Sequence, residues 1–266
     1  MEQSLRSRIG SVALPALFAV LLLFLWQTQL LHRMLGTDTF VLPLPRHIAQ
    51  ILVDNPVKIA ENLRATCSVM FSGLAIGCLL GYGISVAAAL FPKWGSGGLR
   101  VIGAFNAVPI VALAPVVINL TRDASDDVEV RSTIAKTIVV ALLCAVAMSI
   151  GAYRGLTDLQ PFAEDLLKSY AADRKTVFLK LRLPNSVPHI FIALRVIVPT
   201  SVISALITEY FAEHVIGIGR MIRDNITLAQ YATAWAYIVV ACALGIASYA
   251  VLMLAQRLIC GRRWRI

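Results

Sequence analysis

The side chains that could perform chemistry in this chain are few, and the densest group lies near residue 209. Glu209 follows Ser201, Ser204 and Thr208, and the spacing places all four along one face of a helix. A carboxylate aligned with small hydroxyls can line a polar passage for a solute. Alternatively, the hydroxyls form hydrogen bonds between helices while Glu209 meets lipid headgroups and water. The residue types alone leave both interpretations open.

No catalytic motif accompanies this group. The sequence lacks the Gly-x-x-x-x-Gly-Lys-Ser/Thr phosphate loop, the His-Glu-x-x-His zinc motif and the Gly-x-Ser-x-Gly nucleophile elbow. Its four histidines fall outside the predicted membrane core, and its five cysteines show no metal-ligand spacing. Intramembrane ionisable groups are too few for the proton relay of an ion-coupled carrier. We therefore expect no enzymatic activity, no metal site and no ATP hydrolysis by this chain alone.

The composition assigns the chain to a lipid bilayer. Of its 266 residues, 58% are hydrophobic and 15% are charged, which leaves too few polar side chains to cover a soluble globule. A helix needs about 20 mostly apolar residues to cross the hydrocarbon core. The stretches that qualify are 12–31, 66–91, 101–120, 134–153, 191–212 and 232–258. We predict an all-α polytopic membrane protein with about six transmembrane helices.

Two of these stretches carry features that affect their interpretation. The third contains Pro109 and Pro115, which a spanning helix tolerates where neighbouring helices or water satisfy the freed carbonyls. The first follows Arg6 and Arg8, but its length and the lack of a cleavage site favour an uncleaved anchor over a signal peptide.

The basic residues set the expected orientation. The net charge is +9, and more Lys and Arg flank the spans on the side of the N-terminus than on the other side. The positive-inside rule therefore favours two cytoplasmic termini. We attribute the positive charge to anionic headgroups and expect no nucleic-acid partner, because no nucleic-acid motif accompanies it.

The spans divide the chain into three parts. Residues 43–65 place apolar side chains at roughly helical spacing, interrupted at Pro56, as in a segment on the outer membrane surface. We expect residues 1–65 to form an anchor with this surface segment, residues 66–258 the core, and residues 259–266 a basic cytoplasmic tail. Within the second span, Gly73, Gly77 and Gly81 recur at every fourth position, which indicates close helix packing rather than contact with a solute.

The longest polar interruption, residues 161–192, separates the fourth and fifth spans. Its apolar residues, from Phe162 to Leu181, follow helical spacing, and charged residues occupy the remaining positions. Pro184 disfavours helix at Leu183, so we expect the element to end there and Asn185 or Ser186 to cap the next helix. The result would be a short helical elbow outside the membrane, continuous with the fifth span.

Part of this elbow resembles a known signature. From Asp165 to Pro184 it resembles the EAA motif of permease subunits in binding-protein-dependent ABC importers: Glu-Ala-Ala, three residues, Gly, nine residues, then Ile-x-Leu-Pro. Asp165 occupies the Glu position and Ala171 the Gly position, and the end of the motif is in register at Leu181, Leu183 and Pro184. The sequence departs from the pattern where Leu166 and Leu167 replace the two alanines.

Two further stretches are similar to one branch of that family, the sulfonate, taurine, nitrate and vitamin-precursor permeases. Residues 108–115, Val-Pro-Ile-Val-Ala-Leu-Ala-Pro, match its Pro-x-x-Ala-x-x-Pro segment, and Glu209 followed by Gly217-Ile-Gly219 matches its ending of the fifth span. The branch's Trp-Phe-Gly is replaced by Asn119-Leu-Thr-Arg and an acidic loop, 121–131, which either contacts a binding protein or is simply solvated.

The resemblance implies a type I ABC importer permease in a bacterial-type inner membrane. It implies a homodimer around one translocation path, two partner ATPase subunits that bind ATP and Mg, and a soluble solute-binding protein; the chain itself needs no cofactor. A coupling helix within residues 154–190, between the fourth and fifth spans, would dock on the ATPase. The residues implied in coupling are Asp165, Leu166, Leu167, Lys168, Tyr170, Ala171, Arg174, Leu183 and Pro184. Those implied in the path are Asn106, Pro109, Pro115, Asn119, Ser204, Thr208 and Glu209.

Two other functions remain as alternatives. A secondary carrier would take up solute with an ion gradient and without ATP, and would show inverted repeats, which the sequence lacks. A membrane anchor or sensor subunit would bind a soluble partner at the same loop and move no solute. Uptake by vesicles with and without ATP and a binding protein separates the three.

Overall fold

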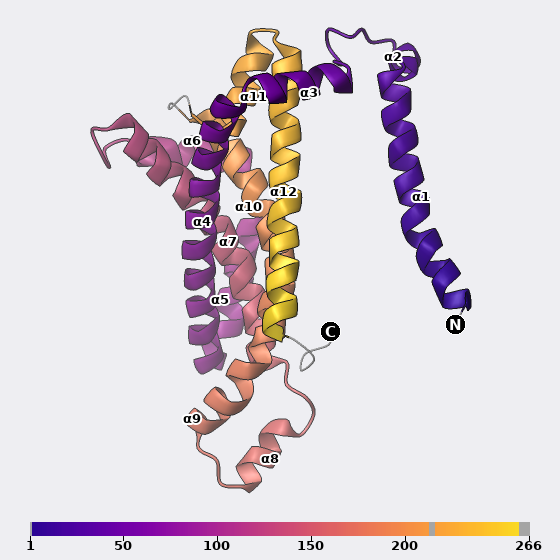
Figure 1. Ribbon diagram of the computed structural model, residues 1–266. Helices are drawn as coiled ribbons and strands as arrows, with labels where there is room; N and C mark the ends of the chain where they lie inside the picture. Colours follow the sequence, from indigo (N-terminus) through magenta and orange to yellow (C-terminus); the bar gives the residue numbers. More distant parts are fainter. Residues whose placement is uncertain (1, 213–215, 261–266) are drawn as a thin grey trace. The chain divides into compact units, whose positions relative to one another are not determined.

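The computed structural model describes residues 2–212 and 216–260, and every regular element in these ranges is helical (Figure 1). The elements are α1 (Glu2–Gln27), α2 (Leu30–Leu35), α3 (Pro45–Asp54), α4 (Pro56–Leu90), α5 (Pro92–Ala104), the 3-10 helix η1 (Phe105–Ala107), α6 (Ile110–Leu120), α7 (Val128–Thr157), α8 (Ala163–Ser169), α9 (Arg174–Val177), the π-helix η2 (Phe178–Arg182), α10 (Leu183–Phe211), α11 (Ile218–Thr227) and α12 (Tyr231–Cys260). The prediction of an all-α polytopic protein is confirmed. Most of the predicted basic tail, from residue 261 onward, lies outside the described residues.

Among the described residues, four helical segments are long and apolar enough to cross a membrane, namely Pro56–Leu90, Val128–Thr157, Arg174–Phe211 and Tyr231–Ile259. A bent pair, Gly95–Ala107 with Ile110–Leu120, raises the number within the described ranges to five if it counts as one span. The apolar part of α1, Ala13–Gln27, is shorter than these segments. A sixth span over residues 12–31 therefore stays a prediction.

The predicted third span, 101–120, is not a straight helix. Its two halves meet at an angle of 99°, and Val108 between them is extended, with φ −76° and ψ 119°. Pro109 explains the break, because a proline sterically disfavours the helical conformation in the residue before it. Pro115, by contrast, lies within α6 and does not interrupt it.

The chain divides into two compact units, which we describe separately. Met1–Ala60 and Met221–Val239 form the first, and Glu61–Arg220 and Val240–Ile266 form the second. In the first unit the rings of Trp26 and Trp235 meet edge to face with centroids 5.7 Å apart, and the Trp235 indole donates a hydrogen bond to the Val41 carbonyl.

The core of the second unit lies between α4, α7 and α10, with side chains of α12 against it. Its buried residues include Met70 on α4, Met148 on α7 and Ile197 on α10, and Leu244 of α12 packs against this cluster. The small residues of α4 allow a close approach, because a Cβ atom built on Gly73 would lie 2.6 Å from Cβ of Val140. At Gly77 it would meet the backbone carbonyl of Ala141, so no side chain fits between the two helices there.

The chain between the elbow and α10 remains helical, and the predicted end at Leu183 is wrong. Arg174–Phe211 forms one helical run, in which the Leu183 amide bonds to the Phe178 carbonyl five residues earlier, as in a π-helix. A proline ring normally clashes with the carbonyl four residues before it. The wider π turn before Pro184 relieves this clash at Lys180, so the helix continues past the proline.

Asn185 also differs from the expectation that it caps the following helix. Its side-chain amide donates hydrogen bonds to the carbonyls of Gly155, at 2.7 Å, and Asp158, at 3.0 Å. These carbonyls belong to the last turn of α7 and to the residue that follows it, where backbone acceptors lack helical partners. Asn185 therefore joins the end of α7 to the start of α10 across the elbow.

Candidate functional site

The elbow between α7 and α10 consists of two short helices joined by a tight turn. α8 carries Asp165 and Lys168, the turn contains Tyr170 and Ala171, and α9 begins after Asp173, whose side chain accepts a hydrogen bond from the Thr176 amide. Hydrogen bonds from the side chain and the backbone amide of Thr176 hold the pKa of the Asp173 carboxyl below its usual value. The elbow is therefore an ordered structure rather than a single amphipathic helix.

Ala171 determines the direction of the chain in the turn. Its φ is +56°, a left-handed conformation that glycine adopts more readily. The Ala172 amide bonds to the Leu167 carbonyl at 3.1 Å and the Ala171 amide to the Lys168 carbonyl at 2.9 Å. This pair of bonds is a Schellman motif, which satisfies the last carbonyls of a helix. The position that the sequence aligned with glycine is thus one where the backbone itself favours glycine.

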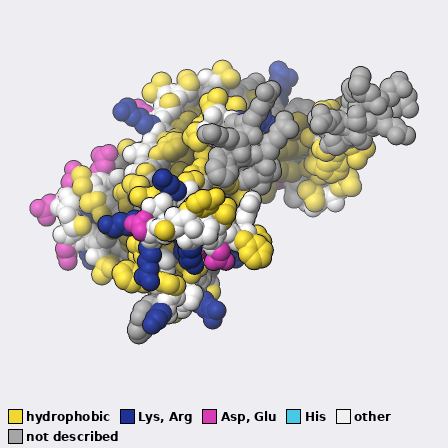
Figure 2. Space-filling view, turned by 90° about the horizontal axis from the view of Figure 1, so that it is seen from below, with side chains coloured by type: hydrophobic (Ala, Val, Ile, Leu, Met, Phe, Trp, Pro, Cys, Tyr) yellow, Lys and Arg dark blue, Asp and Glu magenta, His cyan; other side chains and the backbone are white. Residues whose placement is uncertain are grey.

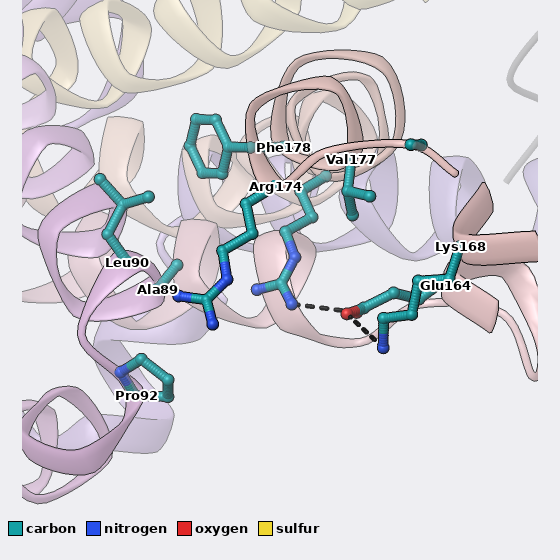
Figure 3. Close-up of a pocket in the computed structure, with 10 residues that line it drawn as sticks. Ala89, Leu90, Pro92, Glu164, Lys168, Arg174, Val177 and Phe178 are labelled. Carbon is teal, nitrogen blue, oxygen red and sulfur yellow. Dashed lines mark hydrogen bonds and ion pairs between the residues drawn. The ribbon is translucent and has the colours of Figure 1, made fainter. Parts of the chain in front are cut away.

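Glu164 ties α8 to the helical run behind it. Its carboxylate lies 3.0 Å from the Arg182 guanidinium and 3.2 Å from the Lys168 ammonium (Figure 3). Hydrogen bonds from Lys168 and from Arg182 hold the pKa of the Glu164 carboxyl below its usual value. This contact was not predicted from the sequence. The spacing to Lys168 was visible along the helix, but nothing in the sequence joins Glu164 to Arg182.

A cavity of about 400 Å³ opens between this part of the elbow and the turn joining α4 to α5 (Figure 3). Ala89 and Leu90 line it from the end of α4, Pro92 from the start of α5, and Arg174 and Phe178 from the far side. The elbow therefore lies next to the end of α4 and the start of α5, as well as next to the helix that follows it in the chain.

Large apolar side chains of the elbow face outward. Phe162, Leu166 and Tyr170, spaced four residues apart, are 81%, 60% and 78% exposed. Leu166 lies on α8, and Phe162 and Tyr170 are the residues that flank this helix. The view from below shows hydrophobic side chains lying among Lys and Arg side chains on this face (Figure 2). Such a surface outside the spans is typical of a protein-binding site.

The predicted coupling residues all belong to the elbow or its exit, but they differ in exposure. Leu167, Leu183 and Pro184 are half-buried, whereas the exposed ones are Asp165, Leu166, Lys168, Tyr170, Ala171 and Arg174. Phe162, the most exposed apolar side chain of the elbow, was noted only for its spacing and not as a site residue. Its exposure could not be read from an apolar residue at a core-like spacing.

Glu209, at the far end of α10, is completely buried. Its Oε2 accepts hydrogen bonds from the Gly219 amide at 2.9 Å and the Thr66 hydroxyl at 3.0 Å. The Ile218 amide donates to the Thr66 hydroxyl at 3.0 Å, and the Gly217 amide donates to the side chain of Asn62 at 2.8 Å. Three successive amides at the start of α11 thus bond to side chains of α4 and α10.

Gly217 fits this arrangement in two ways. Its φ of +132° is unfavourable for other residues, and a Cβ atom there would lie 2.5 Å from the Glu209 carboxyl carbon. Glu209 therefore joins α10 to α4 and to the start of α11. Among the described residues its Oε1 has no hydrogen-bond partner.

The other predicted path residues separate into two groups. Ser204 and Thr208 are buried and donate to carbonyls of their own helix, at Thr200 and Ser204. Asn106, Pro109 and Asn119 are exposed along η1 and α6, and Pro115 is half-buried. The first group lies on α10, and the second lies on η1, on α6 and at Pro109 between them.

No metal centre accompanies these features. In the ranges 2–212 and 216–260, no group of three or more His, Cys, Asp or Glu side chains could hold a metal ion.

Sequence comparisons match most of the chain. The family model described as binding-protein-dependent transport system inner membrane component matches residues 73–265. The formylaminopyrimidine transport permease protein ThiX of Halalkalibacterium halodurans is 26% identical over 237 residues, 89% of this chain and 90% of that protein. A probable ABC transporter permease protein of Haemophilus influenzae is 21% identical over 196 residues, 74% of this chain and 76% of that protein.

Two solved structures have a similar fold. The inward-facing MetNI methionine ABC transporter matches with a TM-score of 0.51 and 15% identity, over 74% of this chain and 94% of that chain. An amino acid ABC transporter crystallised with histidines matches with a TM-score of 0.59 and 14% identity, over 79% of this chain and 97% of that chain. At these identities the likeness concerns the fold alone.

Proposed function

The chain belongs to the family of binding-protein-dependent transport system inner membrane components, and on this basis we propose that its elbow is the docking site for a partner ATPase. The protein is the permease subunit of a binding-protein-dependent ABC importer, a multi-pass inner-membrane protein with the type I importer permease fold. Members of the family are permeases and not ATPases, and they work with separate ATPase subunits.

The observation that carries the proposal is the exposure of three large apolar side chains, Phe162, Leu166 and Tyr170, on α8 and at its two ends, in an ordered elbow outside the spans. Exposing these side chains to water is unfavourable, and burial of a large apolar side chain contributes about 1.5–3 kcal/mol. The ion pair of Glu164 with Arg182 supports the same interpretation, because it orients α8 before a partner binds and so lowers the entropy lost on docking. Lys168 and Arg174 add exposed positive charge at the rim.

We propose that motion passes from the docked ATPase through the helical run Arg174–Phe211. The run has no extended break, so displacement of the elbow moves α10 directly. ATP binding would bring two ATPases together and turn the path outward, and hydrolysis would reset it. Nucleotide binding shifts the equilibrium between the inward-facing and outward-facing conformations, and this chain transmits the movement of the ATPases to the path.

The remaining features of the assembly follow the same proposal. Two copies of the chain enclose one path, two ATPases bind ATP and Mg on the cytoplasmic side, and a solute-binding protein docks on the opposite side. Both termini are then cytoplasmic, with residues 1–65 as anchor and surface segment and residues 66–258 as permease core. Asn106, Pro109 and Asn119 are exposed and suited to the path, while Glu209 and its neighbours fix α11 beside it.

Replacing one leucine on the elbow tests the docking site. Leu166 on α8 and Leu179 on η2 are both 60% exposed, so the substitutions Leu166→Gln and Leu179→Gln change polarity equally at two places. We expect Leu166→Gln to weaken association with the ATPase by about 10-fold, as a desolvated apolar contact does. Leu179→Gln should leave it within about twofold of the wild-type value.

Association is measured by co-purification and by titration of the ATPase onto the detergent-solubilised permease. Equal loss in both variants, or retention of full affinity in Leu166→Gln, would show that α8 is not the docking surface. The control for folding is membrane insertion, measured as the amount of each variant recovered in the membrane fraction.

A further inference from the structure

The cavity of about 400 Å³ between the elbow and the end of α4, which we call the elbow cavity, has one basic wall. Lys168 of α8 contributes to this wall, and the helical run that begins at Arg174 supplies the rest. Arg174, Phe178 and Arg182 follow one another at four-residue spacing, so they lie on one side of the run. The volume of the elbow cavity falls within the range of about 300–1,000 Å³ typical of small-molecule sites.

The cations of this wall are only partly balanced by carboxylates. Glu164 lies 3.0 Å from the Arg182 guanidinium and 3.2 Å from the Lys168 ammonium, which is also 3.7 Å from Asp165. Arg174 is exposed, extends into the cavity and forms no ion pair with any residue that the structure describes (Figure 3). Among the described lining residues, three cations face one carboxylate. The elbow cavity therefore has an excess of positive charge.

The opposite wall is apolar and belongs to the end of a membrane span. Ala89 and Leu90 form the last turn of α4, and Pro92 begins α5. Leu90 and the neighbouring Phe91 are 55% and 67% exposed. Because α4 is long and apolar enough to cross the hydrocarbon core, its end lies where lipid headgroups meet water. The basic wall thus faces the level of the headgroup phosphates.

The elbow cavity and the exposed docking face use different sides of α8. Leu166 is two residues away from both Glu164 and Lys168, which line the cavity or its ion pairs. Two residues correspond to a rotation of about 200° around a helix, so Leu166 points away from them. A ligand can therefore occupy the cavity while a partner protein contacts Leu166.

We propose that the elbow cavity binds a phosphate group, with the guanidinium groups of Arg174 and Arg182 as its donors. A guanidinium presents a planar fork of N–H groups that matches the oxygens of a phosphate, and its charge strengthens these hydrogen bonds. An anionic phospholipid and free inorganic phosphate share this chemistry. The apolar wall favours the lipid, whose acyl chains can lie against Leu90 and Phe91 while its headgroup meets the arginines.

The inference rests on the proposed function in one respect, the placement of the elbow on the cytoplasmic side of the membrane. A phosphate in the cavity would connect the helical run that begins at Arg174 to the headgroup layer beside α4. The lipid composition of that leaflet would then affect the position of the elbow.

Ligand binding to the full-length chain, purified in detergent without its ATPase, tests the inference. In the lipid arm, phosphatidylglycerol is compared with a diacylglycerol that has the same acyl chains and no phosphate. In the soluble arm, inorganic phosphate is compared with chloride at equal ionic strength. The variants are Arg174→Gln, Arg174→Lys and the control Arg154→Gln, which removes an exposed arginine of α7 outside the cavity. The readouts are the midpoint of thermal unfolding and the number of bound lipids by native mass spectrometry.

We expect phosphatidylglycerol, at about ten times its Kd, to raise the midpoint of the wild type and of Arg154→Gln by about 3–5 °C. Arg174→Gln should weaken binding about 10-fold and reduce the shift to about 1 °C at the same concentration, whereas Arg174→Lys should keep more than half of it. A shift in the soluble arm alone, lost in Arg174→Gln, identifies free phosphate as the ligand of the same cavity. No shift in either arm, an equal shift with diacylglycerol, or equal shifts in Arg174→Gln and Arg154→Gln overturns the inference.

The variant Leu166→Gln separates this site from the proposed docking site. Because Leu166 lies on the other side of α8, this variant should keep the full shift with phosphatidylglycerol. Failure of the docking proposal would appear in co-purification with the ATPase, and failure of the phosphate site would appear in the shifts of the isolated chain.

Discussion

Ala171 occupies a position where its own side chain works against the fold. The left-handed backbone that directs the chain from α8 toward α9 costs a non-glycine residue about 1–2 kcal/mol. The Schellman bonds to Leu167 and Lys168 hold the turn in spite of this cost. The elbow therefore contains a local strain that one substitution can remove.

Ala171→Gly is expected to raise the stability of the chain by up to about 1 kcal/mol, because relief of the strain exceeds the added entropy of the unfolded glycine. The midpoint of thermal unfolding in detergent measures the effect. Ala87→Gly, at an exposed position within α4, is the matched control and should lower stability by about 0.5–1 kcal/mol. A decrease in both variants would contradict a strained turn at Ala171.

Glu164 makes a pH-dependent contribution to the stability of the fold. Because its carboxyl pKa is lowered in the folded chain, its ion pairs stabilise the fold above the unfolded pKa of about 4.3 and lose that effect as the pH falls through the lower folded value. Glu164→Gln should reduce stability at pH 7 by at most about 1 kcal/mol, since the pair is partly exposed to solvent.

The measurement compares unfolding midpoints of wild type and Glu164→Gln from neutral to acid pH. The two curves should converge below about pH 4. Asp165→Asn is the control, because Asp165 is 73% exposed and lies 3.7 Å from Lys168. A constant difference across the whole range would mean that the ion pairs do not contribute.

At the scale of elements, the contact of α4 with α7 depends on the absence of a side chain at Gly77. A Cβ atom there would lie 2.6 Å from Cβ of Cys144 and would also meet the Ala141 carbonyl. Gly77→Val must push the helices apart and is expected to cost about 3 kcal/mol or more. The fraction of chain recovered as a folded, monodisperse species and its unfolding midpoint measure the loss.

Gly83→Val on the same helix is the matched control for Gly77→Val. A Cβ atom on Gly83 meets nothing within 4 Å. This change should therefore be nearly neutral, since valine is no worse than glycine within a helix. Similar losses in the two variants would indicate that α4 does not depend on close packing at Gly77.

Elements differ in how far the sequence predicts them. The long spans follow from hydropathy, which is a local property, and the break at Pro109 follows from a steric rule acting on one neighbour. The same rule at Pro184 gave the wrong result: Leu183 is helical, and a π turn relieves the separate clash of the proline ring with the Lys180 carbonyl. A rule based on adjacent residues does not include that wider geometry.

At the scale of the whole molecule, the energy source of transport separates an ABC permease from an ion-coupled carrier. Vesicles containing this chain with its ATPase should accumulate solute only when ATP and the binding protein are both present. A non-hydrolysable ATP analogue should reduce uptake to background, and ionophores should leave it unchanged. Uptake that follows an imposed ion gradient without ATP would contradict the proposed function.

The candidate sites show why whole-molecule features are harder to predict than motifs. The elbow was identified because its signature is continuous in sequence. The burial of Lys136, by contrast, was not predicted, because it depends on α4, which lies some seventy residues earlier in the chain. Glu209 was noticed, but its partners Thr66 and Gly219 come from two other elements, so its bonding could not be distinguished from exposure to headgroups.

The unbroken helix from Arg174 to Phe211 also limits how the length of the chain can change. Each residue turns a helix by about 100°, so one inserted residue between Arg182 and Glu209 would rotate one contact away from its partner. Adding seven residues nearly restores the relative orientation of the two contacts but lengthens the helix by about 10 Å. Insertions and deletions are thus excluded from this segment, whereas the connection between α7 and α8, which is not helical, can accept them.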